Sequence, residues 1–267
     1  MAEHRAVPLQ GLRLKVAIER LLARLFRESA PPWLLKGGYS MELRFRPQAR
    51  TTRDLHLALR GPVGPGTLEA RLNLAHQSLM TAARLELADH FVFTIAPARK
   101  QLAGAPDGGG TFAVTATLAG RVFANFHVDL GFGDAELGTA ESLVGDDLLS
   151  FAGIPPVIAL AIPRAQQFAE KAHAYTHPRT DRVNTRSRDL VDMVLLIERG
   201  GLDTGQVKVA LSATFARRNG RRVPKTLAPP PTEWEAEFPS MAKQAGLRSA
   251  SVSEAFATLR VLWEGLH

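Results

Sequence analysis

The sequence contains no cysteine, and it lacks several other signals that would assign it to a protein class. Without cysteine, neither disulfides nor thiol chemistry need be considered. It has no run of about 20 apolar residues, so we expect no membrane span. The charged residues Glu3, His4 and Arg5 stand where a signal segment would be apolar, and we therefore expect a cytoplasmic protein. No Gly-x-Ser-x-Gly elbow is present, which leaves serine hydrolase chemistry with little support.

Positive charge is the main compositional bias of the chain. Lys and Arg number 33 against 26 Asp and Glu, which gives a formal net charge of +7 and a pI of about 10.2. This balance favours a polyanionic partner, most simply nucleic acid. The alternative is a basic surface that only keeps the protein in solution. The hydrophobic content of 45% is ordinary, and 267 residues are enough to bury a real core in one large or two modest domains.

Hydrophobic periodicity divides the chain into two halves. In the first half, helical patterns at 9–28 and 66–85 are mixed with strand-like runs at 90–97 and 111–119. The segment Ala119-Gly120-Arg121 predicts a hairpin turn into the next strand. The second half is helical throughout, with helices expected over 164–176, 185–199, 203–218, 232–246 and 252–265. We therefore predict an α+β fold, with an α/β domain over residues 1–160 and a helical domain over 161–267.

Two acids lie in strands of the first half. Asp54 begins the pattern Asp-Leu-His-Leu, and Asp129 follows the pattern Phe-His-Val. Residues two apart on a strand share a face, so Asp54 points with His56, and Asp129 points with His127. If the two strands are neighbours, Asp54, His56 and Asp129 converge on one cluster. Since an acid in an apolar strand is costly to bury unless it is paired or binds a metal, these acids indicate a metal site.

A glycine turn precedes the first acid. A short apolar strand ends at Lys36, and Gly37-Gly38-Tyr39-Ser40 opens a short helix. The N–H groups of such a turn hold phosphate, and carboxylates hold a divalent metal against it. This is the layout of nucleotidyl transfer. The structural alternative is that Asp54 pairs with Arg50 or Arg53 and that Asp129 caps a loop.

Three separated segments of the chain also form a family pattern. The first joins Lys36–Ser40 to Arg50–His56, the second is Asp129–Asp134, and the third is Phe168–Ala174 followed by Arg186–Asp192. The helix end Thr214–Arg218, with Pro224 and Pro229-Pro230-Pro231 after it, extends the pattern. In this order the segments resemble the AbiEii/MenT-like nucleotidyltransferase toxins of bacterial toxin–antitoxin systems. The resemblance runs from about residue 30 to the C-terminus.

The resemblance implies a DNA polymerase β-like nucleotidyltransferase core, a mixed sheet with helices, followed by a mostly α-helical half that completes the active site. It implies transfer of a nucleoside monophosphate from an NTP to RNA, above all the tRNA 3′ end, and a cognate antitoxin protein as partner. The residues implied are Asp54, Lys171 and Asp189 for catalysis, Asp54, His56 and Asp129 for Mg²⁺ or Mn²⁺, and Lys36, Gly37, Gly38, Ser40 and Lys171 for the nucleotide. The alternative is a catalytically weakened relative that binds RNA or a partner protein.

Lys171 and Asp189 form a second chemical cluster, in the helical half. Lys171 lies in an apolar helical stretch, from which a lysine can reach triphosphate oxygens; the alternative is a surface lysine that only extends its ammonium into water. Asp189 and Asp192 are three residues apart and share a helix face. The family's functional acid corresponds to Asp189, which we interpret as positioning Lys171 or the nucleotide. Asp192 is interpreted as scaffold paired with Arg186 or Arg188.

His56 departs from the family pattern, which usually has a second acid at this position. Magnesium prefers oxygen ligands in near-octahedral geometry, whereas imidazole suits manganese or zinc-like ions better. His56 therefore weakens magnesium binding, shifts the metal preference or contacts a phosphate, or it marks an inactive enzyme. The sequence leaves these alternatives open.

A basic run stands at the end of a predicted helix of the second half and continues into a loop. Arg217, Arg218, Arg221, Arg222 and Lys225 fall within nine residues, with Asn219-Gly220 as a turn. Two such cations would be explained by the helix dipole, but five predict contacts with an RNA phosphate backbone. Gly145-Asp146-Asp147, which is similar to a polymerase tripeptide, stands in a loop-like stretch and is interpreted as structural.

Overall fold

The computed structural model describes residues 8–46, 54–61, 64–102, 104–135, 137–178, 183–218 and 220–266. These residues form two compact units. The sheet unit comprises the described residues within 8–43, 54–135 and 140–161, and the helical unit comprises those within 44–46, 137–139 and 162–266. Residues 50–53 of the first family segment and Asn219 of the basic run lie outside the described residues.

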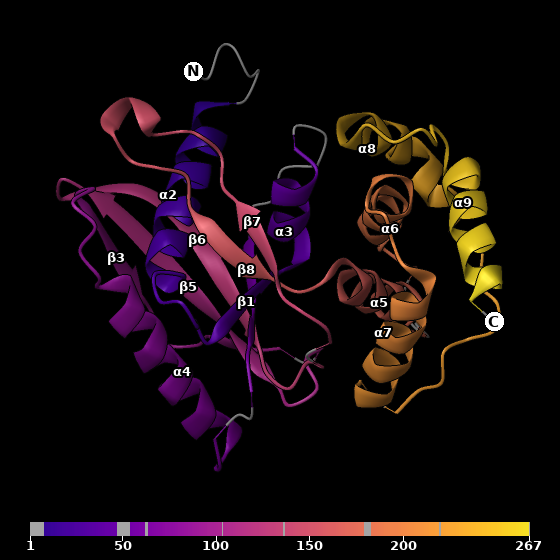
Figure 1. Cartoon of the computed structure of the whole chain (residues 1–267), viewed down its shortest axis with the longest axis horizontal. Helices are drawn as coiled ribbons and strands as arrows, with labels where there is room; N and C mark the ends of the chain where they lie inside the picture. The colour runs from indigo at the N-terminus through magenta and orange to yellow at the C-terminus, as the bar shows by residue number, and fades with distance from the viewer. Residues whose placement is uncertain are drawn as a thin grey trace. The chain divides into compact units, whose positions relative to one another are not determined.

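An eight-stranded sheet is the frame of the sheet unit (Figure 1). Its strands are β1 (Trp33–Lys36), β2 (Asp54–Leu59), β3 (Phe91–Ile95), β4 (Lys100–Gln101), β5 (Gly109–Leu118), β6 (Arg121–Gly131), β7 (Glu141–Val144) and β8 (Ile158–Ala161). They follow the order β3-β5-β6-β2-β1-β8-β7, and β4 pairs with β5. The sheet is mixed, because β2–β6 and β1–β8 are parallel while the other pairs are antiparallel.

Two helices cover one face of this sheet. They are α2 (Leu9–Leu25) and α4 (Leu68–Ala83), and a third helix, α3 (Gly37–Arg44), follows β1 directly. The strands alternate, so every second side chain enters the core beneath α2 and α4. The core includes Ile18, Leu21, Leu22, Leu35, Leu55, Leu57, Leu79, Phe112, Val114, Val128 and Leu130. The intervening residues of β2, β5 and β6 project from the opposite face.

The predicted hairpin between β5 and β6 is confirmed. Leu118 pairs with Arg121, and the two residues between them, Ala119 and Gly120, both have positive φ, at 48° and 76°. Positive φ at both central residues is the mark of the tight hairpin turn whose twist matches that of the flanking strands. Between this turn and Asp129 the register shifts by one residue, at an irregularity between Ala116 and Thr117, and Thr111 then stands opposite Asp129.

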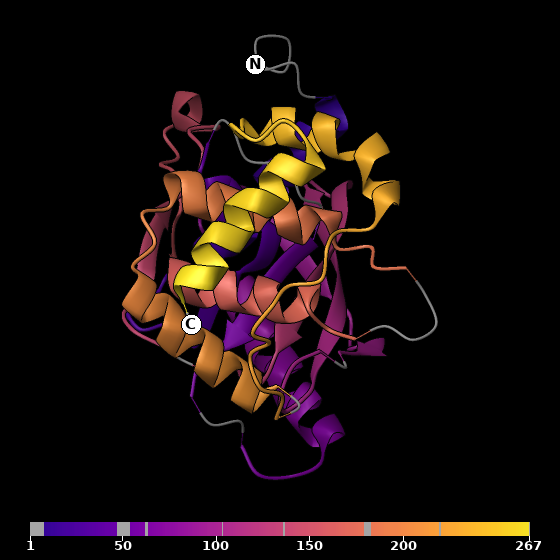
Figure 2. The same ribbon diagram turned by 90° about the vertical axis from the view of Figure 1, so that its right-hand side faces the viewer.

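Helices α5 (Arg164–Tyr175), α6 (Ser187–Arg199), α7 (Thr204–Arg217), α8 (Phe238–Ala245) and α9 (Val252–Gly265) build the helical unit (Figure 2). The central helix is α6, which packs against α5, α8 and α9, while α7 packs against α5. The start of α9 is set by a capping box, in which the Ser251 hydroxyl accepts a hydrogen bond from the Glu254 N–H. The mixed sheet followed by helices confirms the predicted α+β class.

The single helix predicted over 232–246 was wrong. A 3₁₀ turn occupies Thr232–Ala236, and α8 begins only at Phe238, with Pro239 in its first turn. Proline has no N–H to donate and clashes with the preceding turn, so it is tolerated at a helix start but not inside. None of the helices within the described ranges has the length and apolar character required to span a bilayer.

Candidate active site

The strands that carry Asp54 and Asp129 are neighbours in the sheet. β2 and β6 run parallel, in a register that places Asp54 opposite His127 and His56 opposite Asp129. Residues opposite one another, like residues two apart on one strand, project from the same face. The two strands therefore bring all four side chains onto the face that α2 and α4 leave uncovered, as the prediction of one cluster requires.

Each acid of this face lies beside an imidazole. The Asp129 Oδ2 atom is 3.7 Å from His56 Nε2, and the Asp54 Oδ1 atom is 3.9 Å from His127 Nδ1. The other oxygen of Asp129 accepts a hydrogen bond of 2.6 Å from the Thr111 hydroxyl of β5. Asp129 is thus oriented by a strand on each side, whereas Asp54 is contacted at longer range.

Asp54 and Asp129 are less buried than their apolar neighbours in sequence suggest. The side chain of Asp54 is 55% exposed and that of Asp129 is 23% exposed. Asp54 is also the first residue of its strand rather than an interior one. The side chain of Asp54 keeps contact with water, so the cost of burial does not by itself demand a metal at this position. What the geometry supplies is an arrangement of two carboxylates and two imidazoles on one open surface.

The glycine turn after β1 lies against His56 on this face of the sheet. Gly37 has φ of +70°, and a Cβ atom there would come within 3.0 Å of the His56 side chain. Only glycine allows both this backbone conformation and this close approach. The α3 helix begins at Gly37 itself, so the N–H groups of its first turn lie beside the row.

Two residues predicted to bind the nucleotide have partners inside the sheet unit. The ammonium of Lys36 forms an ion pair with Asp134, and both side chains are largely buried. Ser40 is fully buried, and its hydroxyl donates a 2.9 Å hydrogen bond to the Gly37 carbonyl. The Ser40 hydroxyl therefore stabilises the turn from inside.

The site row extends across five strands, which the sequence did not reveal. Lys36 stands opposite His56, His56 opposite Asp129, Asp129 opposite Thr111, and Thr111 opposite Lys100. His127 was visible as a residue two before Asp129. Thr111 and Lys100 had no sequence signal, because their place depends on strand pairing and β4 is only two residues long.

In the helical unit, Lys171 lies between the two acids predicted to share a helix face. Its Nζ atom donates to Asp192 Oδ2 at 2.6 Å and to Asp189 Oδ1 at 3.2 Å. Lys171 is 7% exposed and Asp192 is 1% exposed, which excludes the solvated surface lysine. Arg186 lies 3.6 Å from Asp189 rather than from Asp192. Asp192, interpreted from sequence as scaffold paired with Arg186 or Arg188, is instead the closer partner of Lys171.

The basic run divides into two sets of residues. Arg218 lies 3.3 Å from Glu170, while Arg221 donates to the carbonyls of Thr176 and His173 at 3.0 and 3.3 Å. Both hold the end of α5, and Arg221 also lies over the Phe215 ring, at 5.4 Å from its centroid. Arg217, Arg222 and Lys225 are exposed. Burial lowers the pKa of His173 to about 4, and the neighbouring charges of Arg221 and Arg218 add to this effect.

Because Arg217, Arg222 and Lys225 are exposed, we expect their replacement to change the salt dependence of RNA binding. Replacing the exposed set, Arg217, Arg222 and Lys225, by Gln should lower the log–log slope of affinity against salt by about 2 to 3, at about 0.7 to 0.9 per lost phosphate contact. The melting temperature should stay close to that of the wild type, since these side chains are exposed. The measurement is RNA affinity at several salt concentrations, beside thermal unfolding.

A control set of equal charge is available in the sheet unit. Arg27, Arg84 and Arg121 are exposed and lie outside the basic run. Their replacement by Gln also removes three positive charges from the chain, and it should leave the slope of RNA affinity against salt nearly unchanged. Equal slopes for both triple variants would show that the run is only solvated surface.

The fold and the family follow from comparisons with known proteins. MenT4, a nucleotidyltransferase toxin from Mycobacterium tuberculosis H37Rv, is similar in structure, with a TM-score of 0.62 and 17% sequence identity over 99% of this chain and 87% of MenT4. At this identity the likeness shows a shared nucleotidyltransferase-type fold. The family model described as "Nucleotidyl transferase AbiEii toxin, Type IV TA system" matches residues 20–259. The chain belongs to the AbiEii nucleotidyltransferase toxin family.

This membership confirms the resemblance drawn from the three sequence segments, which all lie inside the matched range. A nucleotidyltransferase-like antigenic protein from Paracoccidioides brasiliensis is a weaker structural match, with a TM-score of 0.40 and 15% identity over 79% of this chain and 91% of that one. No curated protein matches the chain in sequence. As an AbiEii-type enzyme, the protein is a nucleotidyltransferase toxin of a type IV toxin–antitoxin system, a class that uses an NTP and typically a divalent metal.

The donor set of the sheet face suits such a metal by its chemistry. Within the described residues, no three His, Asp or Glu side chains already form a metal centre. The pairs His56–Asp129 and Asp54–His127 nevertheless present two carboxylates and two imidazoles on one face, and all four side chains are partly exposed. Carboxylate oxygens suit Mg²⁺, and added imidazole nitrogen suits Mn²⁺ better. The types of donor on this face therefore suit a divalent metal.

Proposed function

We propose that this AbiEii-family protein transfers a nucleoside monophosphate from an NTP to the 3′ end of an RNA, with tRNA as the first candidate acceptor. The observation that carries the proposal is the placement of Asp54, His56 and Asp129 on one face of the sheet, with the Gly37 turn beside His56. The exposed Arg217, Arg222 and Lys225 supply cationic contacts for an RNA backbone. A cognate antitoxin protein is the expected partner.

The reaction is a displacement at phosphorus. The 3′-hydroxyl oxygen of the acceptor bonds to the α-phosphorus of the NTP, the bond to the β-phosphate oxygen breaks, and pyrophosphate leaves. The proton of the hydroxyl passes to a base or to water. A divalent metal, when bound, would polarise the phosphoryl oxygens and offset the charge that develops on them.

Each residue has a defined part in this proposal. Asp54 and Asp129 are the carboxylates that would hold the metal, with His56 as the third ligand. The N–H groups of the turn at Gly37 and Gly38 would bind phosphate oxygens. Thr111 keeps Asp129 oriented by its 2.6 Å hydrogen bond. In the helical unit, Lys171 would neutralise triphosphate charge, and Asp189 would hold the ammonium of Lys171 in position.

The decisive experiment is an incorporation assay. The purified protein is incubated with total tRNA, a divalent metal and each of the four labelled NTPs in turn. Metal-dependent label at the RNA 3′ end supports the proposal and names the nucleotide. Label on no RNA, with either Mg²⁺ or Mn²⁺, would contradict it.

A second candidate function is favoured by His56 itself. If the imidazole 3.7 Å from Asp129 prevents metal binding, the protein is a weakened relative that binds RNA or a partner protein without transfer. This alternative predicts RNA binding with a normal salt slope and no incorporation of any nucleotide. The two functions are therefore separated by the same assay.

His56 also determines an expected metal preference. His56→Asp adds an oxygen ligand and a negative charge next to Asp129, and we expect it to lower the Mg²⁺ concentration needed for half-maximal transfer by at least about threefold. The native protein should work relatively better with Mn²⁺, which accepts nitrogen ligands. The measurement is transfer rate against the concentration of each metal for both proteins.

The matched control is His90→Asp, which makes the same exchange at an exposed position of the loop before β3. It should leave both metal curves in place. Unchanged curves for His56→Asp would remove His56 from the metal site. Loss of all activity in His56→Asp would instead assign the imidazole a direct role, as a phosphate contact or a proton acceptor.

A further inference from the structure

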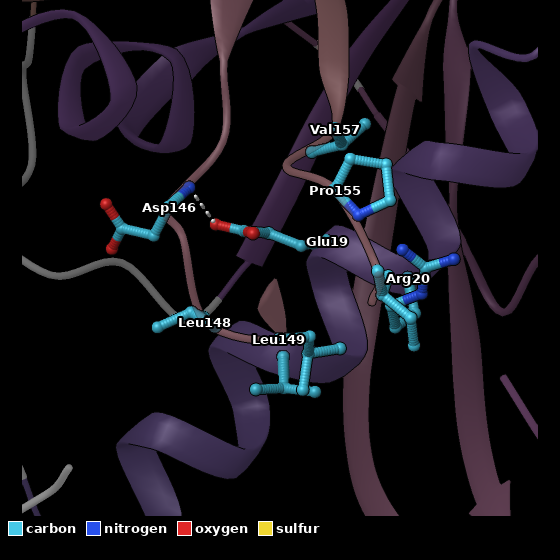
Figure 3. Close-up of a pocket in the computed structure, with 9 residues that line it drawn as sticks. Glu19, Arg20, Asp146, Leu148, Leu149, Pro155 and Val157 are labelled. Carbon is cyan, nitrogen blue, oxygen red and sulfur yellow. Dashed lines mark hydrogen bonds between the residues drawn. The ribbon is translucent and has the colours of Figure 1, made fainter. Parts of the chain in front are cut away.

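The cavity beside Glu19, inside the sheet unit, is too small to hold a substrate. Figure 3 shows the Glu19 carboxyl directed at the backbone nitrogen of Asp146, which donates a 2.9 Å hydrogen bond to it. Around this contact lie Leu148, Leu149, Pro155 and Val157. The cavity that remains measures about 10 Å³, which is room for a water molecule. Substrate contacts of the sheet unit are therefore expected on its surface, and the acids lie on its open face.

Lys100 stands at the far end of the row that crosses this open face. β4 pairs with β5, so that Lys100 is opposite Thr111, and Thr111 is in turn opposite Asp129 of β6. Residues that pair across neighbouring strands project from the same face. Two strand spacings of about 4.8 Å place the backbone of Lys100 roughly 10 Å from that of Asp129. The flexible four-carbon stem of lysine covers about half of this distance, so the ammonium can reach a group bound beside Asp129.

The ammonium of Lys100 is open to a ligand. Lys100 is exposed, and its side chain has no ion-pair partner among the residues that the structure describes. Lys36, at the other end of the same row, is instead paired with Asp134. A cation that extends from the sheet without a carboxylate beside it is suited to bind an anion from outside the protein.

The face beside Lys100 continues with neutral hydrogen-bonding side chains. Thr94 of β3 stands opposite Thr115 of β5, which stands opposite Asn125 of β6. The Thr115 hydroxyl donates a 2.9 Å hydrogen bond to the side-chain oxygen of Asn125, which leaves the amide N–H groups of Asn125 as donors. Thr94 and Asn125 are exposed. Such donors beside a lysine suit the phosphate and sugar oxygens of a nucleic acid strand.

The direction of the proposed reaction gives the two ends of the row different roles. The Gly37 turn lies beside His56, on the side of the acids that faces away from β5 and β4. In the proposed function this turn binds the phosphates that leave as pyrophosphate. The attacking and leaving oxygens lie roughly in line at the phosphorus, so the acceptor hydroxyl has to approach from the opposite side of the acids. Lys100 lies on that side.

We propose that Lys100 binds the last internucleotide phosphate of the acceptor RNA and so holds the 3′-hydroxyl on the Asp129 side of the site. The exposed Thr94 and Asn125 line the path of the strand farther from the acids. The contact is a charge-assisted hydrogen bond between the ammonium and a phosphate oxygen. This inference rests on the proposed transfer to RNA, to which it adds the place of the acceptor strand.

Lys100→Gln is expected to weaken RNA binding and to leave nucleotide binding unchanged. The probe is a synthetic stem–loop RNA with a single-stranded 3′ end, and its Kd is measured at several salt concentrations without NTP. We expect the Kd to rise by at least about threefold and the log–log slope to fall by about 0.7, as for one phosphate contact of a single strand. The Kd of each NTP with Mg²⁺ should stay that of the wild type. Lys100→Arg should restore RNA binding, because it keeps the charge.

The matched control is Arg121→Gln. Arg121 is an exposed cation at the hairpin end of β6, whereas Asp129 lies near the other end of this strand. Its replacement removes one positive charge from the same unit and should leave the RNA Kd and its salt slope close to those of the wild type. Equal losses in both variants would show that only the total charge matters, and would overturn the contact at Lys100.

A modified RNA locates the contact on the strand. A methylphosphonate at the last internucleotide linkage removes the charge of that phosphate. It should weaken binding to the wild type but weaken binding to Lys100→Gln no further, because the contact is already lost. A methylphosphonate inside the stem should affect both proteins alike. Additive losses at the last linkage would overturn the proposal and leave Lys100 as a charge that protects an edge strand from pairing.

The incorporation assay separates this inference from the proposed function. In wild type and Lys100→Gln, the variant should have a higher KM for RNA and an unchanged KM for the NTP. Transfer with additive losses at the last linkage would overturn this inference alone. Coupling between Lys100 and the last linkage, without transfer of any nucleotide, would overturn the proposed function and support a protein that binds RNA ends.

Discussion

Asp54→Asn is expected to lower the rate of nucleotide transfer by at least about a hundredfold while the protein stays folded. The carboxylate would hold the metal against the triphosphate, and its loss removes several kcal/mol of transition-state stabilisation, at about 1.4 kcal/mol per tenfold in rate. Stability should change by less than about 0.5 kcal/mol, because the side chain is 55% exposed. Transfer rate and thermal unfolding of the same preparation are the measurements.

The control for this substitution is Asp147→Asn. Asp147 is an exposed acid of the same unit, in the segment after β7, and contributes nothing to the sheet face. It should keep the activity of the wild type. A folded Asp54→Asn protein with full activity would remove Asp54 from the metal site. Asp129→Asn separates the two acids further, because Asn retains an oxygen that can accept the hydrogen bond from Thr111.

Lys171→Met is expected to destabilise the protein by about 3 to 5 kcal/mol, because it leaves the buried carboxylates of Asp192 and Asp189 without their ammonium partner. The side chain of Asp192 is 1% exposed and cannot regain water. Adding Asp192→Asn to Lys171→Met removes the negative charge that lay closest to the lost ammonium and should restore much of the stability. Denaturant unfolding of the wild type, both single variants and the double variant gives the coupling energy directly.

The double variant also separates structure from catalysis. If Lys171 neutralises triphosphate charge, a folded Lys171→Met/Asp192→Asn protein should still lose most of its transfer activity. Wild-type activity in that protein would show that Lys171 is only half of a buried ion pair. Lys208→Met on α7 is the matched control, since Lys208 is an exposed lysine of the same unit and should tolerate the change in both assays.

Much of the local structure was predictable because it depends on neighbours in sequence. The 3.6-residue periodicity of the second half predicted α5, α6, α7 and α9 to within a few residues. The wrong prediction of a single helix over 232–246 also has a local cause. Pro239 is visible in the sequence, and proline is not tolerated in the interior of a helix. The pairing of Asp54 with His56 on one face followed from strand alternation alone.

Other features depended on pairings that no local pattern encodes. Helix α4 and strands β3, β4 and β5 lie between β2 and β6 in sequence. The two strands are nevertheless parallel neighbours, and only their register sets His56 opposite Asp129. Thr111 and Lys100 join the row for the same reason. Glu19 and Asp146 are 127 residues apart, and nothing in either segment signals their hydrogen bond.

Charge shows the same division between sequence and tertiary structure. The sequence by itself determined that the chain is basic and that it carries acids on two strands behind a glycine turn. It also determined that five cations gather at the end of α7 and in the residues that follow. Only the tertiary structure decided that Asp54 is half exposed and that Lys171 is buried against Asp192. It also decided that Arg218 and Arg221 contact α5. The physical reason is that residue type and spacing are local properties, whereas burial and ion pairing depend on which distant surfaces pack together.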